Sequence, residues 1–190
     1  TYFWKKIKDK VQGKAMVEAA LEINHWCAGE VMYQGTDMRT GSALEIYRSG
    51  VGRCGEEAVF VVNVMRSAGI PARPVYVPRW SHCDDNHAWV EVWCDGDWHY
   101  LGACEPEAVL DKGWFTNAAS RAMMIGSRWY DRAMPDEKVI GKDGMNRIIN
   151  LLGKYAKTRW ITITVEDLDG TPAAGAKVRA EVMNYGEFSP

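Results

Sequence analysis

The sequence has no run of roughly twenty apolar residues and no strong excess of charge of either sign. Its formal net charge is -2 and its pI is near 6.1, so we expect neither membrane insertion nor a nucleic-acid partner. The first residues lack the apolar region and small-residue cleavage site of a signal peptide, and the chain begins without Met. We interpret it as an excised fragment whose compartment is left open.

Closely spaced cysteine pairs are also missing, which excludes a zinc knuckle. The odd count of five cysteines leaves at least one thiol free or intermolecular. The cysteines are Cys27, Cys54, Cys83, Cys94 and Cys104. The segment 81–87 carries His, Cys and Asp, but these ligand types are packed too closely for any common zinc spacing. We expect no metal and no cofactor.

The composition that is present, 47% hydrophobic and 25% charged over 190 residues, is typical of a globular protein with one sizeable core. Apolar residues at helical spacing predict a core helix over 15–27, a short helix after the polar loop at Tyr33, and a helix from Cys54 to Gly69. Alternating residues predict strands over 73–77, 87–93 and 98–101, the last two joined by a turn at Asp95-Gly96. The stretches 123–129 and 137–152 receive no assignment.

Cys54 has the position of an activated thiol. The unpaired N–H groups at the start of a helix favour a thiolate, and Arg53 adds a positive charge beside it. Gly52 and Gly55 flank the thiol without side chains, so a substrate carbonyl can approach. A buried cysteine at a helix end explains the same position equally well.

A base and a carboxylate are expected near this thiol from the predicted hairpin. With a two-residue turn, the residue opposite His87 is Cys104, whereas a longer loop or a bulge near Gly102 puts Glu105 there. Either register brings Glu105 close to His87. A carboxylate bonded to the imidazole would fix its tautomer and stabilise its protonated form.

Three segments, Gly52–Glu56, Gly69–Arg73 and His87–Trp93, together resemble the ordered signature of the transglutaminase-like superfamily. The resemblance implies an α+β papain-like fold, in which a helix-borne cysteine packs on an antiparallel sheet. It also implies that Cys54 is the nucleophile and His87 the base. Glu105 stands where the family usually has Asp.

The family's oxyanion hole combines the N–H of the nucleophile with an upstream polar side chain, for which Trp26 and Gln34 are candidates. Trp26 follows an apolar helical face, so it is equally explained as a core residue. Gln34 lies in a polar loop, where its side chain is equally explained as solvent-exposed. For Arg121 and Arg128 the sequence leaves two interpretations, binding of a substrate carboxylate or a position on the surface. The five Trp residues at 80, 89, 93, 98 and 114 line a cleft or pack across strands.

From Trp160 the sequence predicts an all-β segment, with alternation over Trp160–Val165 and Ala176–Val182 around a turn at Asp167–Gly170. It resembles the opening hairpin of small β-sandwich repeats that are often fused to secreted enzymes, but about thirty residues are too few for a sandwich. We therefore predict a transglutaminase-like catalytic domain over 1–155 and a truncated β-sandwich-like segment or appended hairpin over 156–190.

The resemblance implies a cysteine-dependent acyl-transfer enzyme that hydrolyses peptide or glycopeptide amides through a Cys54 thioester, with a peptide, protein or glycopeptide as its partner. Hydrolysis is favoured because the sequence shows no amine tunnel or calcium loop. The alternatives are amine cross-linking by a transglutaminase and a non-catalytic module that binds peptides or glycans. A secreted, periplasmic or cell-surface location is suspected from the family and from the β-sandwich-like segment. The substrate and its binding residues are not predicted.

Overall fold

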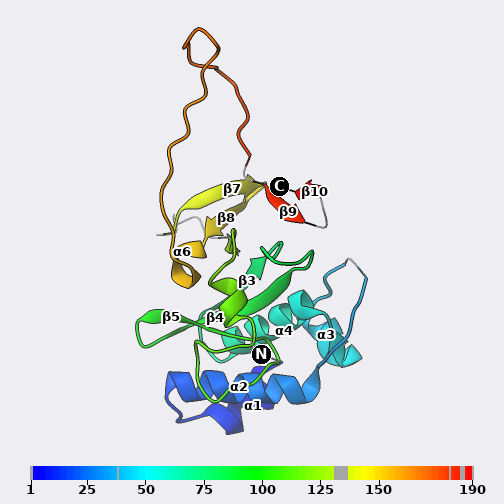
Figure 1. Cartoon of the computed structure of the whole chain (residues 1–190). Helices are drawn as coiled ribbons and strands as arrows, with labels where there is room; N and C mark the ends of the chain where they lie inside the picture. The colour runs from blue at the N-terminus through cyan, green and yellow to red at the C-terminus, as the bar shows by residue number, and fades with distance from the viewer. Residues whose placement is uncertain (1, 38, 131–136, 180, 185–186, 190) are drawn as a thin grey trace.

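The computed structural model describes the chain except for residues 1, 38, 131–136, 180, 185–186 and 190. Its fold is α+β, with helices packed on an antiparallel sheet (Figure 1). The helices are α1 (Trp4–Val11), α2 (Met16–Glu30), α3 (Ala43–Ser49), α4 (Cys54–Ser67), α5 (Thr116–Ala119) and α6 (Leu152–Tyr155). In the part of the chain that is described, no helix is long and apolar enough to cross a membrane.

The main sheet has six strands in the order β5-β4-β3-β6-β8-β7, and all of its neighbours are antiparallel. These strands are β3 (Ala72–Val77), β4 (His87–Cys94), β5 (Asp97–Leu101), β6 (Gly126–Trp129), β7 (Val139–Asp143) and β8 (Asn146–Asn150). Two short pairs lie outside it: β1 (Met32–Tyr33) runs parallel to β2 (Val51–Gly52), and β9 (Val182–Asn184) is antiparallel to β10 (Glu187–Ser189).

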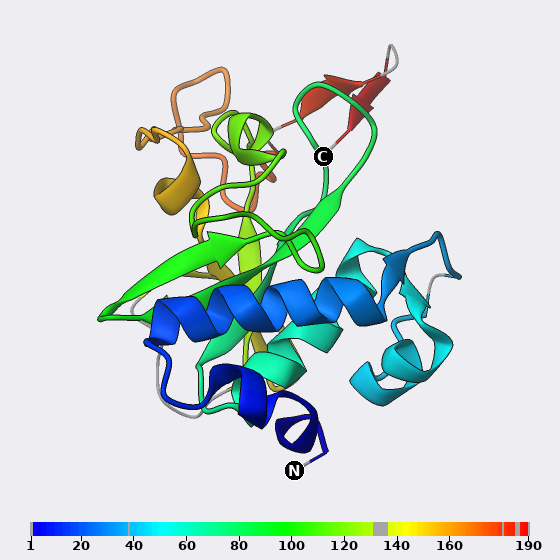
Figure 2. The same cartoon turned by 90° about the horizontal axis from the view of Figure 1, so that it is seen from below.

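The sheet separates two hydrophobic clusters. One lies among α1, α2, α3 and α4 and includes Val90 and Val92 of β4, while Trp89 of the same strand belongs to the other cluster with Phe115 and Ile149. This division follows from strand geometry, because successive side chains point to opposite faces. In Figure 2 the long blue helix α2 lies in front of the sheet, with the darker blue α1 beside it.

The helix that carries Cys54 begins and ends as the sequence predicts. The Glu56 side chain accepts a hydrogen bond from the Arg53 N–H at 3.2 Å, which satisfies one donor at the start of α4. At the other end Gly69 has a φ of 84°, the left-handed conformation that glycine adopts most easily, and Pro71 follows. The helix packs against β3 and β4, which fixes the position of its first residue relative to the sheet.

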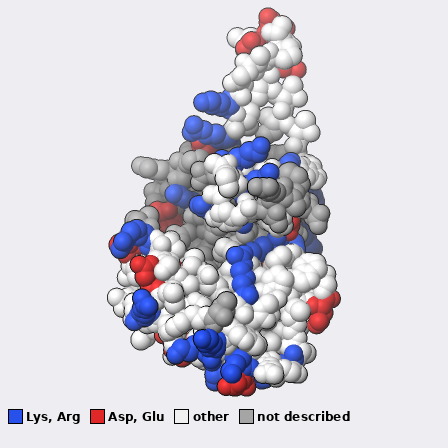
Figure 3. All heavy atoms as spheres, turned by 180° about the vertical axis from the view of Figure 1, so that it is seen from behind, with Lys and Arg blue, Asp and Glu red and all other residues white. Residues whose placement is uncertain are grey.

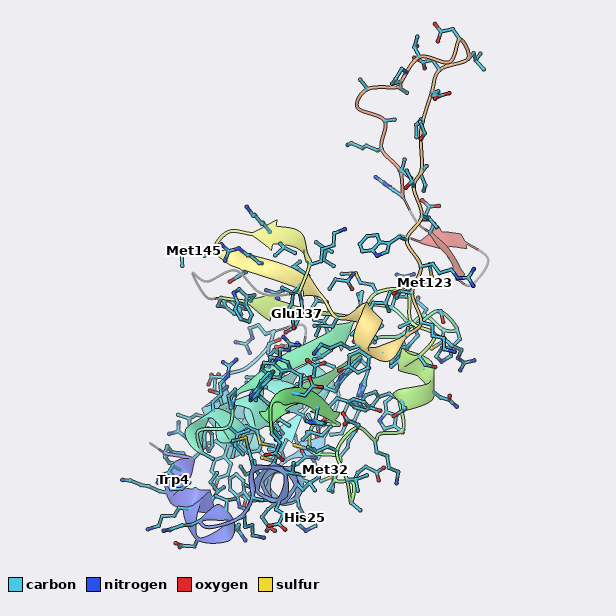
Figure 4. The ribbon with its side chains drawn as sticks, turned by 90° about the vertical axis from the view of Figure 1, so that its left-hand side faces the viewer. Trp4, His25, Met32, Met123, Glu137 and Met145 are labelled. Atoms are coloured by element: carbon cyan, nitrogen blue, oxygen red, sulfur yellow. The ribbon has the colours of Figure 1, made fainter. Side chains whose placement is uncertain are left out.

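The β4–β5 hairpin confirms the predicted two-residue turn, since Cys94 pairs with Asp97. Asp95 and Gly96 have φ angles of 52° and 97°, as the tightest hairpin turns require. Strands β6, β7 and β8 lie in the stretches that the sequence leaves unassigned. Met145 at the tip of the β7–β8 hairpin is 90% exposed and labelled in Figure 4.

The segment after α6 differs from the prediction of two strands at Trp160–Val165 and Ala176–Val182. Residues 157–179 form an extended arm that projects from the body in Figure 1, and its ladder is limited to one bridge between Glu166 and Pro172. Trp160 and Ile161 are 84% and 78% exposed. An alternating segment forms a stable strand when one face is buried, and the described chain offers this arm no such surface. The domain boundary near residue 155 remains a prediction.

On the face shown in Figure 3, Lys and Arg cover more of the surface than Asp and Glu, which lie mainly toward its edges. The chain as a whole has a formal net charge of -2, with 23 basic residues against 25 acidic ones. Local charge around a cavity therefore matters more for recognition than the total charge of the chain.

Candidate active site

Cys54 is the first residue of α4 and is half-buried. Strand β2 ends just before it and is held in place by a hydrogen bond from the Gln34 N–H to the Gly52 carbonyl, at 2.9 Å. The backbone N–H groups of Gly55 and Ala88 lie near the Cys54 sulfur and favour its thiolate. Because Ala88 follows His87 in β4, this contact brings the start of the helix to the start of the strand.

The pKa of the Cys54 thiol is raised in this structure, mainly because burial disfavours the thiolate. The two N–H donors and the Arg53 charge act in the opposite direction without outweighing burial, and Glu57 adds to the increase. The sequence predicts a lowered pKa from the helix terminus alone. That prediction is wrong, because it takes no account of the burial of the sulfur.

His87 is the first residue of β4 and is 7% exposed. Four aromatic rings surround its imidazole, and the shortest centroid distances are 4.6 Å to Trp114 and 5.0 Å to Phe115. The other two rings are those of Trp80 and Trp89. Its Nε2 is buried and makes no hydrogen bond with another described residue.

Burial among these rings lowers the pKa of His87 to about 4, although the nearby Asp85 charge favours the protonated form. His87 is therefore neutral at ordinary pH. Because the pKa of the Cys54 thiol is raised and that of His87 is lowered, the two side chains do not form an ion pair at ordinary pH.

A buried polar network supports one wall of the imidazole site. Trp89 donates from Nε1 to the Tyr155 hydroxyl at 2.9 Å, and that hydroxyl donates to Glu91 at 2.6 Å. Glu91 also accepts from Arg73 at 2.6 Å, and Arg73 reaches Glu137, labelled in Figure 4, at 2.7 Å. These bonds tie β3, β4 and α6 together and fix the ring of Trp89 beside His87.

Glu105 lies at the end of a tight turn that follows β5. The β4–β5 ladder stops at Leu101. Gly102 then forms an isolated β-bridge with Glu105, so the pairing does not continue toward His87. A Cβ at Gly102 would overlap the Glu105 side chain, and Cys104 has a φ of 58°. Neither of the two predicted registers extends to His87, because the chain folds back on itself before it reaches that position.

Asn24 of α2 holds this turn and is a site residue that the sequence analysis misses. It is 1% exposed, donates to the Gly102 carbonyl at 2.9 Å and accepts from the Cys104 N–H at 3.0 Å. A signal was available: Asn24 lies between Ala20 and Cys27 on the buried stripe of a helix, where a polar side chain requires a partner.

The Glu105 carboxylate accepts hydrogen bonds from Trp114 Nε1, at 3.0 Å to each oxygen. Burial raises the pKa of Glu105, and the Trp114 bond opposes that increase. Burial and the Glu105 charge together raise the pKa of Glu57 to about 8. Among the described contacts, none is a hydrogen bond between Glu105 and His87, so the two are linked through the Trp114 ring.

Cys54, His87 and Glu105 line one cavity of about 420 Å³, together with Trp114. The structure thus brings the three residues of the predicted triad to the same space. The candidate oxyanion residues are absent from the described lining. Trp26 stacks on Tyr47 with ring centroids 6.0 Å apart and packs in the core, while Gln34 is exposed between cavity residues.

The structure also places the Trp residues and the possible metal ligands that the sequence singles out. Of the five singled-out Trp residues, Trp114 lines this cavity, whereas Trp93 and Trp98 pack edge to face across the hairpin, 5.5 Å apart. Among the residues described, no group of three or more His, Cys, Asp and Glu side chains has the arrangement of a metal site.

This geometry agrees with the comparison with known families. The model of the transglutaminase-like superfamily core matches residues 5–103, which includes the helix of Cys54 and the strand of His87. The chain belongs to the transglutaminase-like superfamily. No curated protein matches the chain significantly.

Several solved structures are similar to it. A candidate cysteine protease from Cytophaga hutchinsonii has 19% identity and a TM-score of 0.46, with 78% of this chain and 56% of that chain covered. LapG of Legionella pneumophila has 17% identity and a TM-score of 0.46, with 56% and 64% covered. A candidate protease from Parabacteroides distasonis has 17% identity and a TM-score of 0.49, with 66% and 25% covered. The chain spans less than two thirds of each of these proteins.

Proposed function

We propose that the protein is a cysteine-dependent acyl-transfer enzyme that hydrolyses peptide or glycopeptide amide bonds, with Cys54 as nucleophile and His87 as base. The observation that carries this proposal is that the Cys54 thiol and the His87 imidazole line the same cavity, with the backbone N–H of Ala88, the residue after His87, near the sulfur. The match of residues 5–103 to the transglutaminase-like core supports the same class of reaction.

In the acylation step the Cys54 sulfur attacks the amide carbonyl carbon while His87 accepts the thiol proton. The C–S bond forms, and the carbonyl electron pair moves to oxygen. His87 then donates that proton to the amide nitrogen, the C–N bond breaks, and the amine leaves. A thioester on Cys54 remains, and His87 is neutral again.

In the deacylation step His87 accepts a proton from a water molecule as the water oxygen attacks the thioester carbon. Collapse of this second intermediate breaks the C–S bond and releases a carboxylic acid. The sulfur takes back the proton from His87. The low pKa of His87 suits this cycle, because the imidazole starts each step unprotonated.

The oxyanion of each intermediate needs hydrogen-bond donors. The backbone N–H of Cys54 opens α4 and bonds to no other described residue, so we assign it as one donor. Trp26 and Gln34 remain the predicted candidates for the second. Gln34 is exposed, and its N–H bond to Gly52 holds its backbone near the nucleophile segment, whereas the Trp26 ring is packed in the core.

A screen of peptide and glycopeptide substrates tests the proposed reaction. We expect new carboxyl termini or released amines with the wild-type chain and none with Cys54→Ala, measured by mass spectrometry. Adding a primary amine separates the two acyl-transfer outcomes, since a hydrolase yields mainly acid and a transglutaminase mainly the new amide. Binding of peptides or glycans without any turnover would contradict the enzyme and identify a binding module.

Glu105 has a positioning role in this proposal, because its carboxylate fixes Trp114 against His87 and places a negative charge near the imidazolium formed during turnover. We expect Glu105→Gln to lower kcat by about tenfold to a hundredfold, since the amide oxygen still accepts from Trp114 but the charge is lost. Trp114→Phe keeps the charge and removes the bond.

The comparison of these two variants separates charge from packing. A loss of kcat in Glu105→Gln that is much larger than in Trp114→Phe supports electrostatic stabilisation of the imidazolium. Cys104→Ser serves as the neighbouring control and should keep most of the activity. Full activity in Glu105→Gln would exclude a role for the carboxylate in turnover.

A further inference from the structure

A second cavity, of about 520 Å³, adjoins the first at the reactive pair. Cys54 and His87 line both cavities, as do Arg53 and Asn86. Since the two spaces meet at the thiol, an extended substrate can occupy both, with its scissile amide at Cys54. The second cavity is therefore placed to hold substrate groups on one side of the bond that the proposed function would cleave.

The walls of this second cavity are mainly apolar. Val59 contributes from α4, and Pro74 and Tyr76 contribute from β3, whereas the neighbouring Val75 and Val77 are fully buried. Such a surface suits an aliphatic portion of a substrate residue. It provides little specificity by itself, because one methylene group more or less in an apolar pocket changes discrimination only modestly.

Among the described residues, the charged side chains that line the second cavity are all cationic. Arg53 and Arg128 line it, and none of its described lining residues is Asp or Glu. The first cavity differs, since Asp85 and Glu105 are among the residues that line it. Arg53 lines both cavities, so the described acidic side chains on one side of Cys54 and Arg128 on the other make the difference, and this gives a substrate charge a preferred side.

The guanidinium of Arg53 donates to the Thr40 hydroxyl at 2.8 Å, whereas that of Arg128 makes no hydrogen bond with another described residue. Arg128 lies on β6, which is fixed beside β3 by the pair Tyr76 and Gly126, and its own partner in β8 is Ile148. Its side chain is exposed and makes no ion pair with another described residue. Arg73, on the neighbouring strand, instead binds two carboxylates. A planar guanidinium that lines a cavity without acidic residues is suited to bind a carboxylate with two parallel hydrogen bonds.

We propose that Arg128 binds an acidic side chain of a peptide substrate in this second cavity, so that the enzyme selects substrates with Glu or Asp on that side of the cleaved bond. The apolar walls from α4 and β3 accommodate the methylene groups of that residue, and Glu offers one more of them than Asp. This inference rests on the proposed hydrolase function and names the class of substrate that the same site takes.

Internally quenched peptides that differ only in one residue, Glu, Gln or Lys, test this selectivity. The substituted position is moved stepwise along both sides of the cleaved amide. For the wild-type chain we expect one position at which Glu exceeds Lys in kcat/KM by at least about tenfold, as for one well-formed ion pair. Arg128→Glu should reverse that order. Arg121→Glu is the matched control, because Arg121 is also exposed but is not among the residues lining either cavity, and it should leave the order unchanged.

Binding of the same peptides to the Cys54→Ala variant, measured by fluorescence anisotropy, separates this inference from the proposed function. If the peptides are hydrolysed but the ratio of kcat/KM between the Glu and Lys peptides is the same in the wild type and in Arg128→Glu, the proposed subsite is contradicted and the proposed hydrolase function is retained. Tighter binding of the Glu peptide that depends on Arg128, without any hydrolysis, would support the subsite and contradict the hydrolase. Equal binding of all three peptides without hydrolysis would contradict both.

Discussion

Replacing Cys54 by Ser is expected to lower kcat/KM for amide hydrolysis by at least about a thousandfold. The hydroxyl of Ser is a far weaker acid than a thiol, and His87, with a pKa of about 4, is a weak base. The existing pair can transfer a thiol proton to the imidazole as the sulfur attacks, but the corresponding transfer from a hydroxyl is much less favourable. Initial rates on the best substrate from the screen measure this loss.

A matched substitution keeps that result from being confused with damage to the fold. Cys83→Ser makes the same chemical change at a half-buried cysteine that lines neither cavity, and it should retain activity within about threefold. Thermal melting should show that Cys54→Ser is as stable as the wild type within about 1 kcal/mol. Hydrolysis by Cys54→Ser at a rate close to that of Cys83→Ser would remove Cys54 from the chemistry.

His87→Gln is expected to reduce kcat by about a hundredfold to ten-thousandfold, the usual contribution of a general base. In the wild-type chain the acid limb of kcat/KM should fall near pH 4, where His87 becomes protonated, instead of near the ordinary imidazole value of 6.5. Above that limb the imidazole is neutral and accepts the thiol proton. A pH series of initial rates measures the midpoint.

The aromatic rings around His87 allow the cause of this acid limb's low pH to be tested. Trp114 is 63% exposed, and its ring lies 4.6 Å from that of His87. Trp114→Ala should let water reach the imidazole, raise its pKa and move the acid limb upward toward 6.5. A limb that stays at the same pH in Trp114→Ala, or that already lies near 6.5 in the wild type, would show that burial does not control this base.

The lowered pKa of His87 also has a consequence for stability. The unfolded chain binds a proton at His87 near pH 6.5 and the folded chain only near pH 4, so unfolding takes up protons between these values. The free energy of unfolding therefore falls as the pH decreases through this window, by about 3 kcal/mol in total from this one group. His87→Gln should remove that part of the pH dependence in denaturant titrations.

Much of the site follows from local patterns in the sequence. The glycine-flanked Cys54 before an apolar helix fixes its own position at the helix start, and the turn at Asp95-Gly96 fixes the pairing of β4 with β5. These features depend on residues close to one another in the chain. They fix the start of α4 and the β4–β5 hairpin, but the position of Glu105 depends on the turn after Leu101 that Asn24 holds.

The remaining features depend on contacts between distant residues. The sequence analysis misses Asn24, whose partners lie about eighty residues away, and it does not predict the bond between Trp114 and Glu105. The predicted direction of the pKa shift of Cys54 is wrong, because burial is a property of the whole fold. The stretch after Trp160 alternates as a strand does, yet the described chain gives it no surface to cover.

Mass analysis of the enzyme quenched during turnover tests the central claim most directly. With a slowly hydrolysed ester or amide of the preferred sequence, the wild-type chain should gain the mass of the acyl group, and digestion should locate it on the peptide that contains Cys54. Hydroxylamine should remove it, as it cleaves a thioester, and Cys54→Ala should acquire none. An acyl group on another residue, or turnover by Cys54→Ala, would contradict the proposed mechanism.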